Sequence, residues 1–397
     1  MVDEKLVPKL RFDFENSNFK KYKLGDLVEN VVAGATPKTS VKEYWDGGDI
    51  PWLSSGEVHK KFVYSTDKFI TSEGYNNAST KLVPKNSVLI ALAGQGKTRG
   101  TVAINKIELC TNQSIASIIP NNNLYYKFLF YYLESKYDYL RALSSSDGGR
   151  GGLNLNLIRS IPIKIPLIDE QKLISNFINS IDKKISILER KYKSYEDFKK
   201  YLMQQIFAQK LRFNFEDEWK TVKIKDIFDE RSEKGFSNLE LLSVTLNDGV
   251  VKRSEIESKD NSNDNKSNYK HVLPEDIVYN SMRMWQGASG VSSYEGIVSP
   301  AYTILIPKNV YSKFFSYYFK TPEIIYQFKK YSQGLTSDTW NLKYPLISDI
   351  KLKIPCIEEQ KEITKLFETI DLKIETIMDN IEEMTIFKKG LLQQMFI

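Results

Sequence analysis

The sequence predicts an α+β protein with a pseudo-two-fold internal repeat: two mixed α/β domains, separated by two long helices that pair as an antiparallel coiled coil. Three observations support this prediction. The chain has 397 residues, which is more than one ordinary domain contains. The segment that begins at Lys164 recurs 189 residues later, at Lys353. Each copy opens a run of about 40 residues whose apolar positions alternate in steps of three and four.

The repeat divides the chain into four segments. We predict a first domain over residues 1–165, a central helix over 166–213, a second domain over 214–354 and a C-terminal helix over 355–397. The two halves open alike, since Lys9-Leu10-Arg11-Phe12 resembles Lys210-Leu211-Arg212-Phe213, and the contents of the two domains then diverge. The chain therefore carries two copies of one frame with different contents.

Two seams of apolar residues predict the long helices. The seam positions are Ile174, Ile178, Ile181, Ile185, Leu188, Tyr192 and Tyr195 in the first segment, and Ile363, Phe367, Ile370, Ile374, Ile377, Ile381 and Met384 in the second. Both seams break the heptad at the same place, because Tyr195 to Phe198 and Met384 to Phe387 are second consecutive steps of three. The two segments carry net charges of +4 and −4. These features favour packing of one helix on the other. The alternative is that each helix covers only its own domain.

Both domains combine short strands with helices in the same order. In the first, β-rich runs at 86–92, 101–104 and 114–119 precede helical periodicity from 124 to 143. In the second, we expect strands over 276–284, 290–294 and 302–306, followed by helices over 311–331 that break near Pro322.

Composition narrows the class of protein. A hydrophobic fraction of 41% and an aromatic fraction of 12% describe folded protein. The net charge of +6 permits nucleic-acid binding, and residues 1–165 alone carry a surplus of +6. Cys110 and Cys356 lack metal-ligand spacing, so we expect two buried thiols and no metal site. We find no signal sequence or apolar span and expect a cytoplasmic protein.

Several motifs resemble a known family. The run Gly34-Ala35-Thr36-Pro37-Lys38-Thr39-Ser40, followed by Gly48-Asp49-Ile50-Pro51-Trp52, looks like the opening of a target-recognition domain in the specificity subunits of type I restriction-modification systems. The segments 166–171 and 355–360, in each of which three residues separate a proline from Glu-Gln, resemble the starts of the two conserved regions of that family. The second domain lacks the first motif and resembles a different recognition subclass.

The resemblance implies a non-catalytic, DNA-binding subunit. Such a subunit recognises a bipartite, asymmetric target, in which two short unlike sequences flank an unspecified spacer. It joins two modification (methyltransferase) subunits and two restriction subunits. It needs no cofactor of its own, because these partners handle the methyl donor and ATP.

Polar and basic residues in turn-rich loops are the candidate DNA contacts. Arginine and lysine pair with guanine edges, asparagine and glutamine pair with adenine, and lysine and threonine bind phosphate. If the strand over 276–284 persists, Arg283 and Trp285 share one of its faces. The candidates are Lys38, Thr39, Gln95, Lys97, Thr98, Arg99, Gln113, Arg150 and Asn154 in the first domain, and Arg283, Trp285, Gln286, Thr339 and Asn341 in the second.

One motif suggests a different function. Residues 91–98, Ala-Leu-Ala-Gly-Gln-Gly-Lys-Thr, fit a loosened P-loop pattern, so a P-loop ATPase with a coiled-coil arm is the alternative. A working P-loop requires a helix directly after its glycine turn. Residues 99–104 instead have the composition of a strand, and the chain carries no other catalytic signature. We therefore expect no catalysis.

Overall fold

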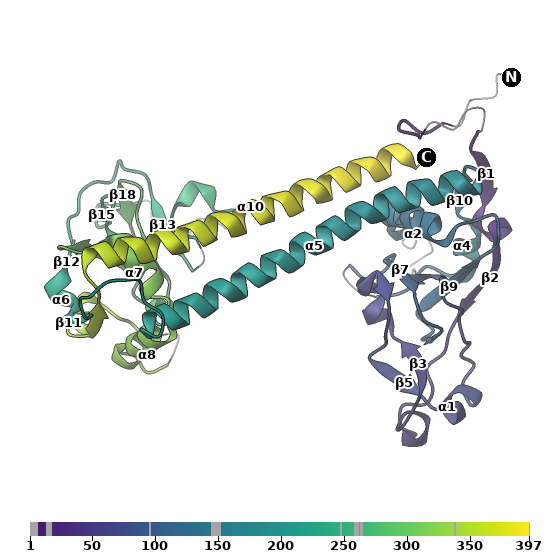
Figure 1. The fold of residues 1–397 in the computed structure, drawn as a ribbon, viewed down its shortest axis with the longest axis horizontal. Coiled ribbons are helices and arrows are strands. Elements are labelled where there is room, and N and C mark those ends of the chain that lie inside the picture. The colour runs from purple at the N-terminus through teal and green to yellow at the C-terminus, as the bar shows by residue number, and fades with distance from the viewer. Residues whose placement is uncertain are drawn as a thin grey trace. The chain divides into compact units, whose positions relative to one another are not determined.

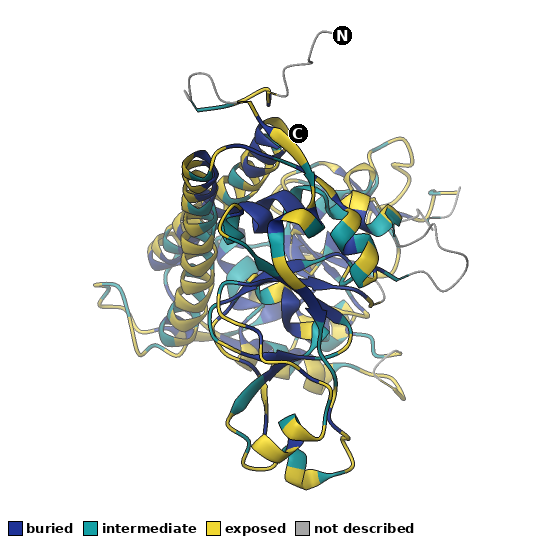
Figure 2. Ribbon diagram, turned by 90° about the vertical axis from the view of Figure 1, so that its right-hand side faces the viewer, coloured by how far each residue is buried: buried dark blue, intermediate teal, exposed yellow. Residues whose placement is uncertain are grey.

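The computed structural model describes residues 7–12, 18–94, 97–143, 152–246, 248–257, 262, 265–336 and 339–396. The chain forms two compact units, the first made of residues 1–189 and 379–397 and the second of residues 190–378. Each unit combines one α/β domain with the first part of one long helix and the last part of the other (Figure 1). Buried residues follow the strands, and exposed residues gather in the connecting loops (Figure 2). The predicted fold class is confirmed.

The first unit contains a five-stranded sheet in the order β2-β9-β6-β7-β4. β4 joins parallel to β7, and the other neighbours are antiparallel. The strands expected near 86–92, 101–104 and 114–119 are β6, β7 and β9. The bounds of this sheet are β2 Val28–Ala33, β4 Phe62–Val63, β6 Val88–Ala91, β7 Val102–Asn105 and β9 Ile115–Pro120.

Smaller elements complete the first domain. The three-stranded sheet β5-β3-β8 and the antiparallel pair β1-β10 accompany the main sheet. The helical stretch expected over 124–143 is two helices, α2 and α3, which break at Lys136 after the hydroxyl of Ser135 bonds the carbonyl of Tyr132. The bounds are β1 Lys20–Lys23, β3 Ile50–Leu53, β5 Lys68–Ile70, β8 Cys110–Thr111, β10 Pro162–Ile165, α1 Ser72–Asn76, α2 Tyr126–Ser135, α3 Tyr137–Leu143 and α4 Leu155–Ser160, with 3-10 turns η1 Leu24–Leu27, η2 Lys42–Tyr44 and η3 Ser55–Lys60.

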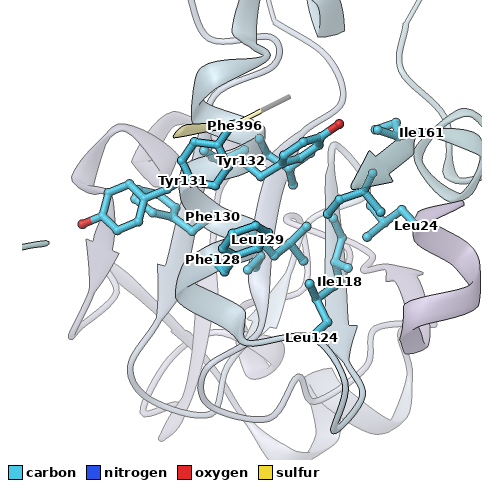
Figure 3. Packing of buried hydrophobic residues seen from close by; sticks show 14 of the residues in the cluster. Leu24, Ile118, Leu124, Phe128, Leu129, Phe130, Tyr131, Tyr132, Ile161 and Phe396 are labelled. Atoms are coloured by element: carbon cyan, nitrogen blue, oxygen red, sulfur yellow. The ribbon is translucent and has the colours of Figure 1, made fainter. Parts of the chain in front are cut away.

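The core of the first unit joins residues from distant parts of the sequence. Phe128 and Tyr132 of α2 contact Phe396, which follows the last long helix, with ring centroids 5.1 and 6.1 Å apart (Figure 3). Leu391, Leu392 and Met395 belong to the same buried cluster. The end of the chain therefore completes the core of the first domain.

The second unit contains a four-stranded antiparallel sheet in the order β12-β19-β16-β17. Three further pairs, β11-β20, β13-β14 and β15-β18, accompany it. The bounds are β11 Lys220–Lys223, β12 Phe228–Glu230, β13 Leu242–Thr245, β14 Gly249–Lys252, β15 Lys270–Val272, β16 Ile277–Asn280, β17 Ser289–Val291, β18 Gly296–Val298, β19 Tyr302–Pro307, β20 Lys351–Ile354, α6 Ile224–Ile227, α7 Ser312–Tyr318, α8 Pro322–Tyr331 and α9 Tyr344–Ile347, with 3-10 turns η4 Arg253–Glu255 and η5 Met284–Gln286.

Two expectations for the second domain meet different outcomes. The helical break near Pro322 is confirmed, because this proline begins α8. The strand expected over 276–284 is wrong beyond Asn280. The side-chain oxygen of Asn280 accepts the Met282 amide at 3.0 Å, and the chain then enters η5. Arg283 and Trp285 therefore do not share a strand face.

The two long helices are α5, Ile168–Phe207, and α10, Ile357–Met395. Every position of both predicted seams is buried or half-buried. In the first unit the ammonium of Lys388 lies 2.8 Å from Asp182, and in the second unit Lys199 lies 2.5 Å from Asp371. These are equivalent positions of the repeat. The end of each helix thus packs beside the start of the other, in antiparallel sense, within each unit.

The motif that opens each long helix has a structural role. Gln171 is buried, accepts the Tyr125 amide at 2.8 Å and donates to the carbonyl of Pro166. Gln360 is also buried and makes the equivalent bonds to Tyr311 and to the carbonyl at 355. The shared glutamine therefore ties the helix start to the segment that follows the main sheet.

Candidate nucleic-acid interface

The loops that carry the first set of candidates leave one edge of the five-stranded sheet. β2 and β6 end there at Ala33 and Ala91, and β9 begins there, because Ala33 pairs with Ala116 and Ala91 with Ile115. β7 begins at the same edge. We call residues 34–40, 92–94, 97–101 and 112–114 the first loop edge.

Hydrogen bonds join the loops of the first loop edge. The hydroxyl of Thr36 donates to the side-chain oxygen of Gln113 at 2.7 Å. The amide of Leu92 donates to the carbonyl of Ser114 at 2.8 Å, and the carbonyl of Leu92 accepts the Leu153 amide at 3.1 Å. Residues 38–39, 97–99, 113 and 154 are thereby gathered at one end of the sheet.

A close approach positions the loop after β2. A Cβ atom on Gly34 would lie 1.8 Å from the carbonyl oxygen of Thr111, so only glycine fits there. The indole of Trp52 then donates to the carbonyl of Ala35 at 3.0 Å, and the indole of Trp45 to that of Lys38 at 3.3 Å. The two indole bonds thus fix the backbone of this loop at Ala35 and Lys38.

The predicted contacts of the first domain are mostly accessible. Lys38, Thr39, Lys97, Gln113 and Asn154 are exposed, and Thr98 and Arg99 are half-buried. Asn154 has a local task, because its side chain caps α4 by accepting the Leu157 amide at 2.9 Å. Gln95 and Arg150 lie outside the described residues.

The second unit repeats this arrangement. β16 ends at Asn280, and its partners β17 and β19 begin beside it. The loop 281–288 leaves this edge and presents exposed Arg283 and Gln286. The Leu342 amide donates to the carbonyl of Ser281 at 2.9 Å, which repeats the Leu153 to Leu92 bond at the same repeat offset. We call residues 281–288 and 339–341 the second loop edge.

An aromatic pair joins the two parts of the second loop edge. The rings of Trp285 and Trp340 meet edge to face with centroids 5.3 Å apart, and the ammonium of Lys329 lies 5.6 Å from the Trp340 ring. Neither Trp340 nor Lys329 is among the residues that the sequence predicts as DNA contacts. A second tryptophan within a polar loop was the available signal, since two aromatic rings stabilise each other when they pair edge to face.

The remaining candidates of the second domain differ in accessibility. Thr339 is exposed, and its hydroxyl donates to the carbonyl of Thr336 at 3.0 Å. Asn341 is half-buried, and its backbone pairs with Gln333. Within the described part of the chain, its side-chain oxygen is buried and accepts no hydrogen bond.

No helix follows the glycine-rich segment at 91–98, as a P-loop would require. The described residues 92–94 and 97–101 form no helix, and the next element is the strand β7, which begins at Val102. The Tyr137 hydroxyl donates to the carbonyl of Lys97 at 2.8 Å and holds this loop. Across the described ranges, no cluster of three or more His, Cys, Asp or Glu could hold a metal ion.

The chain matches a known family over residues 16–196 and again over residues 216–385. This family is described as the type I restriction modification DNA specificity domain. The chain belongs to this family. The two matches cover both α/β domains and most of both long helices.

Curated relatives are similar over different lengths. The chain is 28% identical to the MjaIX specificity subunit of a type I restriction enzyme from Methanocaldococcus jannaschii, over 92% of this chain and 89% of that subunit. It is also 28% identical to the EcoR124I/EcoR124II specificity subunit of Escherichia coli, over 48% of this chain. That match spans 52% of the E. coli subunit, about half its length.

Solved structures share the fold. The crystal structure of the S subunit of a type I restriction-modification system from M. genitalium aligns with a TM-score of 0.60 at 16% identity, over 98% of this chain and 99% of that one. The HsdS subunit from Thermoanaerobacter tengcongensis aligns with a TM-score of 0.52 at 14% identity, over 95% of this chain and 96% of that one. In the described part of the chain, no helix is long and apolar enough to cross a membrane.

Proposed function

We propose that this chain is the DNA sequence-specificity subunit of a type I restriction-modification complex. One observation carries the proposal: the two loop edges follow equivalent strand ends in the two domains, but the side chains that they present differ. A protein that reads two unlike half-sites with one repeated frame needs this arrangement. The relatives named above are specificity subunits, which agrees with the proposal.

Each segment then has a role. Residues 1–165 and 214–354 are two target-recognition domains, and residues 166–213 and 355–397 are the helical segments that join them to partners. The fourteen candidate residues, including Gln95 and Arg150, supply the DNA contacts. The partners are two modification and two restriction subunits, and the assembly works in the cytoplasm. The chain itself catalyses no reaction, and the absence of a helix after the glycine-rich loop leaves the P-loop ATPase alternative without support.

Domain exchange tests the two-half-site reading. Residues 214–354 are replaced by the equivalent segment of another specificity subunit, and the methylated sites of cells carrying the system are mapped. One half of the methylated sequence should change while the other stays intact. Changes in both halves would refute separate reading by the two domains.

Single substitutions test the loop edges. Arg99→Ala or Arg283→Ala should each cost about 1–3 kcal/mol of DNA binding, with relaxed preference at one base position, if the residue reads a base. Lys85→Gln is the control, because this exposed lysine precedes β6 and lies at the opposite end of the sheet. A loss that is equal for all sequences would reassign the arginine to a phosphate contact.

A further inference from the structure

We infer that a basic cleft in the first unit, formed by Lys21, Lys136 and Lys164, binds a phosphate of the DNA backbone beside the first loop edge. This inference rests on the proposed function and adds a site to it. The cleft has a volume of about 340 Å³ and is lined by the three lysines together with Tyr132, Tyr139 and Pro162. None of these lining residues is acidic.

Three separate segments build the cleft. Lys21 lies in β1 and Lys164 in β10, and the two are direct partners across this antiparallel pair, so their side chains leave the same face. Lys136 lies at the junction of α2 and α3, with its ammonium 5.5 Å from the centroid of the Tyr132 ring. The tyrosine hydroxyl bonds the carbonyl of Pro162 and thereby fixes α2 against β10.

The cleft concentrates positive charge. Like charges placed directly opposite on neighbouring strands destabilise a sheet, so the Lys21–Lys164 pair opposes folding. Burial, together with the charge of Lys164, lowers the pKa of Lys136. No carboxylate lies within ion-pair distance of any of the three lysines over the ranges that the structure describes. An anion is therefore the ligand that fits this cleft.

Because the cleft lies near the first loop edge, we expect the anion to be a phosphate of bound DNA. Tyr137, at the start of α3, bonds the carbonyl of Lys97 in the first loop edge, and its neighbours Lys136 and Tyr139 line the cleft, so the cleft lies beside this edge. A duplex read by the first loop edge therefore brings a flanking phosphate to the cleft.

The equivalent positions of the second unit, all of them described, do not repeat the three lysines, which supplies a matched control. The equivalent strand pair places Thr221, not a lysine, opposite Lys353. Pro322 begins α8 at the place where Lys136 follows α2. The phosphate contact thus belongs to the first half-site alone, in line with the surplus of +6 in residues 1–165.

The test compares the variant Lys136→Gln/Lys164→Gln with Lys353→Gln in the full chain assembled with its modification subunits. Duplexes with and without the target sequence are titrated at increasing salt. The double variant should lose affinity equally for both duplexes, and the slope of log K against log[salt] should become shallower by about 0.9 for each lost phosphate contact. Its thermal midpoint should stay equal or rise, because a repulsion is removed. Lys353→Gln should leave the slope unchanged.

A slope equal to that of the wild type would overturn the inference. Weaker assembly with the modification subunits at an unchanged slope would also overturn it, because the cleft would then serve an acidic protein surface. Failure of the proposed function is distinguishable: the wild-type complex would show no preference for its target, while the slope measured on unrelated duplex would still decide the cleft.

Discussion

Lys388 at the end of α10 should stabilise the first unit far more than its repeat equivalent, Lys199, stabilises the second. The Lys388 side chain is 8% exposed and lies 2.7 Å from Glu134 and 2.8 Å from Asp182. The Tyr131 hydroxyl also donates to Asp182 at 2.9 Å. Lys388→Met keeps an unbranched apolar side chain one atom shorter and removes the ammonium group with its charge and hydrogen bonds.

The expected cost follows from burial. Removing one partner of a buried ion pair costs about 3–5 kcal/mol, and here the Glu134 and Asp182 carboxylates, 22% and 12% exposed, would lose their buried cation. Lys61 remains 3.2 Å from Glu134, so we expect the lower end, about 3 kcal/mol. For Lys199→Met we expect about 1 kcal/mol or less, since the Lys199 and Asp371 side chains are 26% and 39% exposed.

Scanning calorimetry with hydrogen exchange measures the difference. For a unit of about 200 residues, Lys388→Met should lower the melting temperature by about 6–12 °C, and Lys199→Met by less than about 4 °C. Peptides from α2 should lose protection in the first variant only, which assigns the effect to the first unit. Equal shifts for the two variants would refute the reasoning from burial.

Three further predictions concern single positions. Arg11→Ala should lower the free energy of unfolding by about 3–5 kcal/mol, because it leaves the fully buried Glu170 carboxylate without its paired bonds. Arg212→Ala should lower it less, because the Trp219 indole still donates to Glu359. Urea unfolding measures both losses, and the reverse order would contradict this expectation. Gly34→Ala should destabilise the loop after β2 by about 1–3 kcal/mol, given the contact with Thr111, and should weaken recognition of the first half-site only, as methylation mapping would reveal. The pKa of Asp349 is lowered to about 2 by hydrogen bonds from Lys225 and Lys223. Its contribution to the free energy of unfolding is therefore present above the ordinary carboxyl pKa near 3.8 and is lost as the pH falls toward 2. The difference in urea midpoint between wild type and Asp349→Asn should vanish across this window, and a difference that persists at pH 2 would contradict the assignment.

Periodicity and repetition account for what the sequence predicts well. The recurrence at Lys164 and Lys353 locates both long helices, and the seam positions are buried or half-buried as the heptad requires. Strands near 88, 102 and 115 are short apolar runs cut by glycine and asparagine, which is a local signal. Such features depend on near neighbours in the chain, so the sequence alone reveals them.

The errors arise where a single side chain redirects the backbone. The strand over 276–284 ends early because Asn280 bonds the amide two residues later, and apolar content alone conceals this turn. The strand Gly296–Val298 was missed because it is short and its pairing with β15 is distant in sequence. The order of strands in the main sheets likewise depends on long-range pairing that no local pattern records.

The candidate site shows the same division. Loop composition selects residues such as Lys97 and Arg283, and their gathering at one sheet edge is decided by register. The basic cleft had no sequence signal at all. Lys21, Lys136 and Lys164 lie far apart in the chain, and each alone looks like an ordinary solvated lysine.

The discontinuous make-up of the first unit has a consequence for synthesis on the ribosome. Residues 190–378 form a unit from one continuous stretch of chain, so it has all its residues before position 379 is translated. The first α/β domain must wait for Leu391 and Phe396, which pack against Phe128 in its core. Folding therefore finishes in reverse order of translation, and the earlier domain keeps an apolar surface uncovered, where chaperones bind, until the final turn of the last helix leaves the exit tunnel.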